Sequence, residues 1–329
     1  KMNKKITCLF LFISILIITG CQHAGWRSNY YQEHPLVGKI WSVAENKFVT
    51  EVELFTNILP SDLIILGEIH DNPDHHILQA KIISTIAKAD RRPLVAFEMF
   101  NVSQQRALDN HLKISPEDSV GIGKAVQWNK SGWPRWELYE PIANVSLKAG
   151  LKIRAANIDP QLLRTIGRSG PEDANPDTKK ALKLFKEFPE QEKAKIQEEI
   201  KIAHCGYAPE NLLDAMATRQ IARDAHMAEQ MLYNSTADGA ILIAGSGHAR
   251  TDYGVPFHLR RANPTKTIFS LAFIEVIPEA TSVNSYTKYF KVDKMPFDFI
   301  WFTPRVNNED ACERFKEQLQ KMKKVEKSG

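Results

Sequence analysis

Three short apolar runs of the sequence each end where acidic or histidine side chains begin. Leu63–Leu66 stops at Gly67, Leu94–Phe97 leads directly into Glu98, and Ala240–Ala244 stops at Gly245. Runs of this length, closed by glycine or a polar residue, are typical of strands that are buried on both faces of a parallel sheet. We therefore predict three such strands, each with polar residues at its carboxyl end.

The rest of the chain alternates between strand and helix patterns. Further strands are predicted near residues 152, 268 and 298, and amphipathic helices over 75–88, 137–149 and 211–233. The pattern also predicts a hairpin around Glu45-Asn46, a helix over 52–59, and another over 103–112 that Ser103 would cap. This alternation predicts an α/β fold with a mostly parallel central sheet and helices on both faces.

Residues 160–210 differ from this regular pattern. Proline and glycine breaks come first, and the charged helical stretch Lys179–Ile202 is interrupted by Pro189. We predict a helical cap inserted at about 160–210, over the functional edge of the sheet. The α/β domain would span 36–306, and a charged C-terminal helix would cover 307–329.

Candidate chemistry lies at the predicted strand ends. In open α/β sheets the ligand site lies just past the carboxyl ends of the strands. Two of these ends share the form Gly-x-x-His, which gives Glu68, His70 and His248, and a third gives Glu98. One such loop could equally be a solvated connection to a helix, but three strands would bring two acids and two histidines to one edge. His75 and His76 are weaker candidates, because they begin the next helix.

A second candidate region is rich in tryptophan. Trp128, Trp133 and Trp136 lie within nine residues around Pro134, close to Tyr139. Each ring taken alone is best explained as core packing. Together they could instead form the wall of a pocket for a flat ligand.

The N-terminal residues have the pattern of a targeting signal. Lys1, Lys4 and Lys5 precede an apolar run over 6–18, which is too short to span a membrane as a helix. The run ends in Gly20-Cys21, as in a bacterial lipobox, although an ordinary signal peptide with an incidental cysteine would look similar. We predict a lipoprotein signal peptide over 1–20, lipidation of Cys21 and a tether over 21–35. Gln22 after the cysteine favours anchoring to the bacterial outer membrane.

Charge and cysteine content limit the function classes. The signal holds three lysines and no acid, so without it the 43 basic residues fall to 40 against 39 acidic ones. This balance gives no support for nucleic-acid binding. Cys205 and Cys312 are the cysteines left beyond the signal and the lipidation site. An oxidising compartment would allow them to pair, but their spacing does not decide whether they do.

Six segments together resemble a known family. They are Pro35–Ile40, Leu66–His76, Phe97–Met99, His204–Gly206, Gln220–Ala228 and Gly245–Arg250, in order along nearly the whole mature chain. They resemble the ChaN-type haem-binding lipoproteins, which share a superfamily with the Tiki proteases and erythromycin esterases. The resemblance implies an outer-membrane lipoprotein that binds haem at a dimer interface for haem or iron acquisition. A haem receptor or transporter is a further partner that it suggests.

Members of that family hold the haem iron by an axial tyrosine with a histidine nearby. On this sequence the first candidate is Tyr207, beside His204 in the predicted cap, and the second is Tyr139. Tyrosinate is a suitable ligand for ferric haem. Cys205 is a weaker alternative, because an oxidising compartment disfavours a free thiolate.

The wider superfamily suggests a rival function. By resemblance to the Tiki and esterase members, Glu68, His70, Glu98 and His248 would hold a divalent metal such as Mn, Zn or Fe in a hydrolase of peptide or ester bonds. Glu98 or Glu68 would then be the general base. A third alternative is a lipoprotein without either activity.

Overall fold

Eight strands form one central sheet in the computed structural model, which describes residues 25–169 and 188–310 and, beyond them, 312–313, 315–317 and 320. The strand order is β2-β1-β8-β7-β3-β6-β4-β5. Neighbours from β8 to β5 are parallel, whereas β1 pairs antiparallel with β2 and β8. The bounds are β1 Ile40–Ser42, β2 Lys47–Val49, β3 Leu63–Glu68, β4 Leu94–Asn101, β5 Ile153–Asn157, β6 Ala240–Gly245, β7 Ile268–Glu275 and β8 Phe299–Thr303.

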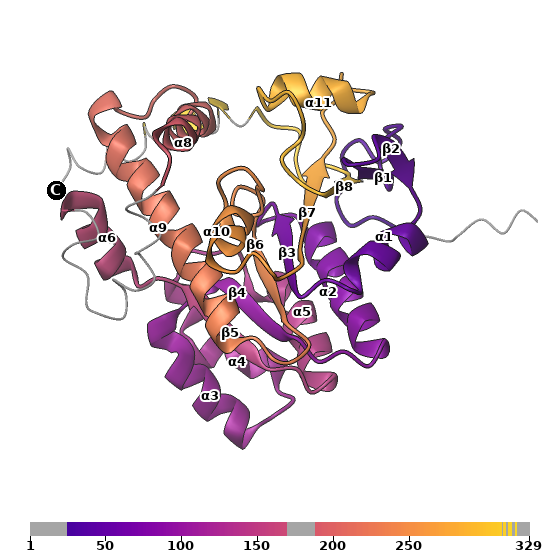
Figure 1. Cartoon of the computed structure of the whole chain (residues 1–329), viewed down its shortest axis with the longest axis vertical. Coiled ribbons are helices and arrows are strands. Elements are labelled where there is room, and N and C mark those ends of the chain that lie inside the picture. Colours follow the sequence, from indigo (N-terminus) through magenta and orange to yellow (C-terminus); the bar gives the residue numbers. More distant parts are fainter. Residues whose placement is uncertain (1–24, 170–187, 311, 314, 318–319, 321–329) are drawn as a thin grey trace, which may run out of the picture.

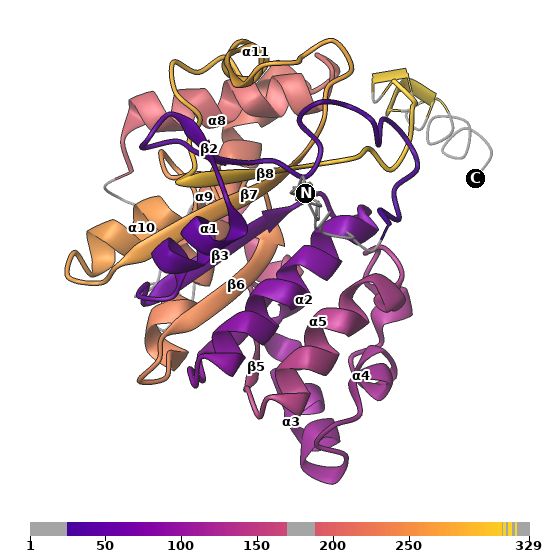
Figure 2. The same ribbon diagram turned by 90° about the vertical axis from the view of Figure 1, so that its right-hand side faces the viewer.

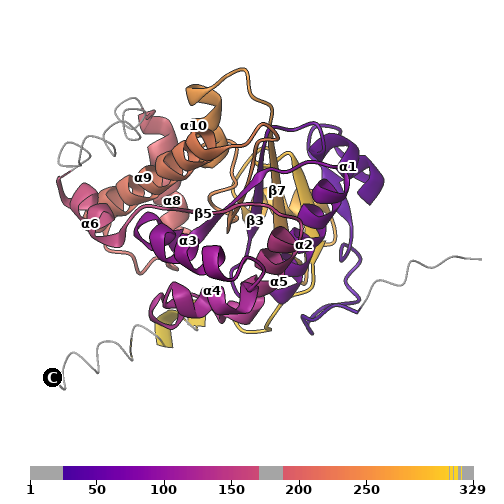
Figure 3. The same cartoon turned by 90° about the horizontal axis from the view of Figure 1, so that it is seen from below.

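Helices cover both faces of this sheet, which confirms the predicted fold class (Figures 1 and 3). One face packs against α1 Glu51–Ile58, α2 Pro73–Lys88, α3 Gln105–Ile114, α4 Ser119–Ala125 and α5 Trp136–Lys148. The other face packs against α9 Glu210–Asn234, α10 Val255–Ala262 and α11 Val283–Tyr289. Two further helices, α6 Pro160–Ser169 and α8 Glu190–Ala203, pack on α9.

The central strands are apolar throughout because both of their faces are covered. In β3 the side chains of Ile64 and Leu66 join the core beneath α2, whereas Leu63 and Ile65 join the core on the opposite face. Successive side chains of a strand point to opposite faces, so a strand between two helical layers needs an unbroken apolar run. The run that stops at Gly67 thus reflects burial on both sides.

Two predicted boundaries were wrong. Ser103 does not cap the helix that follows β4, because a 3₁₀ turn over Val102–Gln104 comes first and α3 begins at Gln105. Glu98 does not end its strand either, since β4 continues to Asn101. Between Phe97 and Asn101 the pairing of β4 with β5 changes register. Such an irregularity changes the direction of side chains locally, and it lies next to Glu98.

Residues 25–35, which we expected to be a tether, pack on the domain instead. The backbone N–H groups of Arg27 and Ser28 donate to the two carboxylate oxygens of Asp74, each at 2.8 Å. Tyr30 forms a β-bridge with Arg305. The first two contacts hold the segment on the first turn of α2, and the bridge holds it against the chain that follows β8. The predicted signal peptide over 1–20 and Cys21 lie outside the described residues.

The cap region begins with α6 and continues in α8, and part of the predicted insertion lies outside the described residues. Figure 2 shows α8 and α11 beyond the carboxyl ends of the central strands, and Lys291, after α11, pairs with Glu198 of α8. Cys205, in the connection between α8 and α9, forms a disulfide with Cys312 near the C-terminal end. The sequence left this pairing open. No helix in the described part of the chain has the length and apolar character needed to cross a membrane.

Candidate functional site

The four residues predicted at the strand ends come together at one edge of the sheet. Glu68 ends β3, His70 follows it, Glu98 lies in β4 and His248 follows β6; we call these four the acid–histidine cluster. Gly245, at the end of β6, lies between them. A side chain there would bring a Cβ within 2.9 Å of Nε2 of His70. The glycine therefore lets His70 lie over the end of the strand.

Glu68 is buried and surrounded by donors. Its Oε1 accepts from Nδ1 of His70 and from the hydroxyl of Tyr139, each at 3.0 Å. Its Oε2 lies 3.1 Å from Nε2 of His76 as an ion pair. Burial alone would raise the pKa of Glu68, but the charge of His76 and the His70 hydrogen bond outweigh burial and hold this pKa at about 2. Glu68 is therefore an anion throughout the physiological range.

Glu98 has an equally complete set of partners. Arg223 of α9 forms an ion pair with Oε1, and the backbone N–H of Gly245 donates to Oε2 at 2.8 Å. Nε2 of His248 lies 3.2 Å from Oε1. Burial opposes ionisation, yet the charges of His248 and Arg223 lower the pKa of Glu98 well below its usual value.

His248 connects Glu98 to a second buried carboxylate, Asp224 of α9. Nδ1 of His248 lies 2.5 Å from Oδ1 of Asp224, so both ring nitrogens face carboxylates and both act as donors. Burial lowers the pKa of His248, but the charges of Glu98 and Asp224 raise it to about 9. The ring is therefore a buried imidazolium at neutral pH.

Sequence reasoning missed the residues that complete the cluster. His76 was judged weak, yet it is buried against Glu68, with its ring centroid 4.4 Å from that of Tyr139. His75 has only a structural position: its Nδ1 accepts from the backbone N–H of Ile69, and its Nε2 lies 2.8 Å from the hydroxyl of Thr303. Arg223 and Asp224 lie in Gln220–Ala228, one of the six segments that resemble the family. They were not predicted as site residues, because charged residues on an amphipathic helix usually face solvent.

The arrangement does not support the predicted metal site. Within residues 25–169 and 188–310, no group of three or more histidine, cysteine, aspartate or glutamate side chains could hold a metal ion. The physical reason is that the carboxylates already have partners within the protein. Glu98 pairs with Arg223 and His248, and the oxygens of Glu68 lie 3.0 Å from Nδ1 of His70 and 3.1 Å from Nε2 of His76. The cluster is a set of compensated charges.

A cavity of about 350 Å³ adjoins the cluster beneath the cap. Its walls include Glu68, His70 and His248 from the sheet edge, together with Ile196, Glu199, Ile200 and Ala203 from α8. His204 also lines it. The predicted helical insertion thus supplies one wall of the cavity. We call this space the inner cavity.

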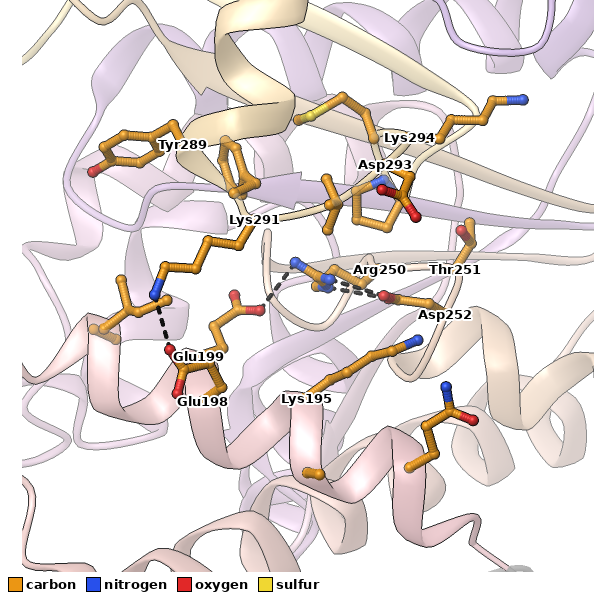
Figure 4. A pocket seen from close by; sticks show the side chains of 18 residues that line it. Lys195, Glu198, Glu199, Arg250, Thr251, Asp252, Tyr289, Lys291, Asp293 and Lys294 are labelled. Atoms are coloured by element: carbon orange, nitrogen blue, oxygen red, sulfur yellow. Dashed lines mark hydrogen bonds and ion pairs between the residues drawn. The ribbon is translucent and has the colours of Figure 1, made fainter.

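A larger cavity of about 790 Å³ lies between α8 and the segment that follows α11 (Figure 4). Glu199 lines both cavities. Its carboxylate lies 3.0 Å from Nη1 of Arg250, and the guanidinium also contacts Asp252 at 2.8 Å. Lys291 and Glu198 pair at 2.9 Å across the same space. These charges neutralise one another, so the larger cavity shows no preference for an anion or a cation.

The two candidate haem tyrosines differ sharply in accessibility. Tyr207 is 49% exposed and follows a turn at Cys205 and Gly206, both of which have positive φ. Tyr139 is completely buried, and its hydroxyl donates to Glu68. Burial and the charge of Glu68 raise its pKa, which opposes formation of a tyrosinate. The geometry therefore favours Tyr207. Cys205 is no alternative ligand, because its sulfur is in the disulfide.

Fold and site together define a class of protein: an α/β domain with a buried acid–histidine cluster beneath a helical cap. Residues 54–259, more than half of the chain, match the family described as "Haem-binding uptake, Tiki superfamily, ChaN". The chain belongs to this family, which confirms the resemblance seen in the sequence.

One solved structure shows the same fold. The structure described as "Cofacial heme binding to ChaN of Campylobacter jejuni" is 22% identical, with a TM-score of 0.63; the match covers 80% of this chain and 95% of that one. An erythromycin esterase mutant in its open conformation has a TM-score of 0.41 at 12% identity, over 83% of this chain and 99% of the esterase.

A plant protein is similar in sequence. It is RETICULATA-RELATED 5, a chloroplastic protein of Arabidopsis thaliana, with 23% identity over 276 residues. The match covers 76% of this chain and 35% of the plant protein, so this chain spans about a third of the length of that relative.

Proposed function

We propose that this chain binds haem at the connection between α8 and α9 and serves in haem or iron acquisition. The observation that carries the proposal is membership of the haem-binding uptake family over residues 54–259. Haem binding is also what the description of the Campylobacter jejuni structure states for that protein.

The residues around Tyr207 fit a haem group. Ferric haem supplies an iron that binds a phenolate oxygen, and Tyr207 presents an exposed phenol. Nδ1 of the neighbouring His204 lies 2.8 Å from the carbonyl oxygen of Ile200. A carbonyl only accepts, so Nδ1 is the donor in this hydrogen bond. Phe315 contacts both rings, with centroids 5.5 Å from His204 and 6.3 Å from Tyr207.

We also propose that two copies hold haem between them and that Cys21 carries a lipid anchor to the bacterial outer membrane. An exposed tyrosine leaves much of a porphyrin uncovered, and a second copy would cover it. The word "cofacial" in the description of the Campylobacter jejuni structure fits such a pair. The lipobox pattern in the sequence supports the anchor. A haem receptor or transporter would be the next partner in such a pathway.

Hemin difference spectra of variants test the ligand. Tyr207→Phe removes the phenolate oxygen, so we expect the charge-transfer bands of tyrosinate-bound ferric haem to be lost. Tyr233→Phe is the matched control. It also removes a phenol hydroxyl, and Tyr233 is 81% exposed on α9. Size-exclusion chromatography with and without hemin tests dimerisation. An unchanged spectrum in Tyr207→Phe would remove the ligand assignment, and a monomer at saturating hemin would remove the dimer.

A second candidate is hydrolysis of ester or peptide bonds in the inner cavity. The specific observation is the position of His70: its Nδ1 is engaged by Glu68, while Nε2 lies over Gly245 beside the cavity. Burial lowers the pKa of His70, but the hydrogen bond that it donates to Glu68 and the charge of Glu98 raise this pKa overall. In its neutral form Nε2 would accept a proton from water as that water attacks a carbonyl carbon. His248 would hold Glu98 in place in this site, because both of its N–H groups donate to Glu98 and Asp224.

Turnover of nitrophenyl esters by the purified chain tests this candidate. His70→Ala and His248→Ala should each abolish it, while His111→Ala on the distant α3 should leave it unchanged. Metal analysis of the same samples tests the metal-dependent form: bound Mn, Zn or Fe near one per chain, lost in both cluster variants, would support it. Equal hydrolysis by the unmodified chain and by the His70, His248 and His111 variants would eliminate the enzyme candidate.

A further inference from the structure

The disulfide attaches the C-terminal segment to the connection between α8 and α9. Asp310 accepts from the backbone N–H groups of Cys312 and Glu313, at 2.7 and 3.3 Å, and so begins a helical turn there. Lys316 pairs within this segment, with Glu313 at 3.4 Å. No described residue of 312–320 forms a hydrogen bond or an ion pair with the cap. The bond from Cys312 to Cys205 is therefore what holds the segment there.

Cys205 occupies a backbone position that does not favour a cysteine. Helix α8 ends at Ala203, and Cys205 and Gly206 follow with φ values of 52° and 75°. Residues with a Cβ rarely adopt such values, and glycine or asparagine is usual where a helix ends in this way. The turn itself thus gives no reason for a cysteine at this position, whereas the disulfide does.

Phe315 follows Cys312 by three residues and packs against both residues of the proposed haem site. Its ring meets that of His204 edge to face, at 90° with centroids 5.5 Å apart, and its centroid lies 6.3 Å from that of Tyr207. Among the described residues, no other ring contacts either of them. The hydrogen bond to Ile200 fixes one edge of the His204 ring, but the Tyr207 hydroxyl has no partner within the described ranges. Phe315 is therefore the aromatic contact that limits where the Tyr207 phenol points.

We propose that the disulfide makes Phe315 a positioning residue of the haem site, an inference that rests on the proposed binding of haem at Tyr207. A phenol that is already oriented loses less freedom when its oxygen binds iron, so the contact strengthens binding. The disulfide joins residues that are 107 apart in sequence, and it thereby keeps Phe315 at a high local concentration beside Tyr207. The family match ends at residue 259, so this support lies outside the matched part of the chain.

Hemin titrations of two alanine variants test the role of Phe315. Phe315→Ala removes the ring and keeps the disulfide, so we expect about two- to tenfold weaker binding. The charge-transfer bands of tyrosinate-bound ferric haem should also be weaker at saturation, because the phenol is less well oriented. Phe48→Ala is the matched control, because Phe48 is 42% exposed on β2. It should bind hemin like the unmodified chain, and equal affinities in the two variants would overturn the proposal.

Reduction of the chain tests the role of the disulfide. The chain is reduced with a phosphine, capped with iodoacetamide and desalted before hemin is added, so neither the reductant nor a free thiol can bind the iron. A control sample receives iodoacetamide alone. The reduced chain should bind hemin at least as weakly as Phe315→Ala does, and Cys205→Ser/Cys312→Ser should reproduce this without treatment. Unchanged affinity in both would overturn the proposal.

Tryptic cleavage after Lys316 tests the attachment of the segment without haem. Cleavage should be faster in the reduced chain and in Cys205→Ser/Cys312→Ser than in the control sample, and equal rates would show that the disulfide does not hold the segment. The outcomes also separate this inference from the proposed function. If the unmodified chain does not bind hemin, both are wrong; if all variants bind hemin equally, only the role of Phe315 is wrong.

Discussion

Replacing Arg223 by methionine tests whether the acid–histidine cluster is held by compensated charges. Among the described residues, the guanidinium of Arg223 is the only permanently charged cation next to Glu98, and the Glu98 side chain is 1% exposed. Removing one partner of a buried ion pair typically costs about 3–5 kcal/mol, because the other charge is left buried. Glu98 would keep the Gly245 N–H and His248, so we expect the lower end, about 3 kcal/mol.

Urea unfolding and thermal melts of Arg223→Met measure this loss. For a domain of this size about 3 kcal/mol corresponds to a fall in Tm of roughly 6–12 °C. Arg219→Met is the matched control on the same helix, because Arg219 has no carboxylate partner within the described part of the chain. It should change stability by about 1 kcal/mol or less. In Glu98→Gln/Arg223→Met the loss should be smaller than the sum of the two single losses. A stability of Arg223→Met equal to that of the control would refute the reasoning.

Three further predictions follow from the packing, the disulfide and the buried histidine. Gly67→Ala would place a Cβ 2.7 Å from Cβ of Ala249 and 2.9 Å from Cα of Ser246, so urea unfolding should show a loss of about 1–3 kcal/mol; an unchanged midpoint would contradict that packing. Cys205→Ser/Cys312→Ser removes the disulfide that closes a loop of 107 residues and should lower the free energy of unfolding by about 4 kcal/mol. Reductant should lower the Tm of the unmodified chain and leave the Tm of this variant unchanged. The pKa of His248, raised from 6.5 to about 9, gives stability that is complete below pH 6.5 and is lost as pH rises to 9. The loss is about 3 kcal/mol; melts of His248→Gln should not show this decline, and an equal decline in both proteins would assign it to other groups.

The centre of the fold could be predicted because its signals are local. The runs that end at Gly67 and Gly245 are apolar without alternation, which indicates strands covered on both faces. Their carboxyl ends must share an edge, and this predicts that Glu68 and His248 lie together. The antiparallel addition of β1 to β8 could not be predicted in the same way. It joins residues near 40 to residues near 300, and such pairing depends on tertiary packing.

The partners of the cluster were harder to predict than the cluster itself. Asp224 and Arg223 lie on a long amphipathic helix, where a charged residue usually faces solvent. Here α9 crosses the sheet edge and points both side chains at Glu98 and His248. His76 is similar, because only the packing of α2 shows that its ring faces Glu68. Periodicity gives the polar face of a helix, but its neighbour in the fold decides whether that face is buried.

Accessibility separated the two haem candidates, and sequence could not provide it. Tyr139 follows the tryptophan stretch and Tyr207 follows His204, so both had a plausible neighbourhood. The structure buries Tyr139 against Glu68 and exposes Tyr207 beyond the disulfide. Because α5 packs on α2, the side chain of Tyr139 is carried into the core.

A hemin titration of the unmodified chain, followed by Soret absorbance, tests the central proposal most directly. The account predicts a shifted Soret band that saturates at a fixed ratio of haem to chain. Absorbance that rises linearly without saturation, as for free hemin, would contradict haem binding by this protein.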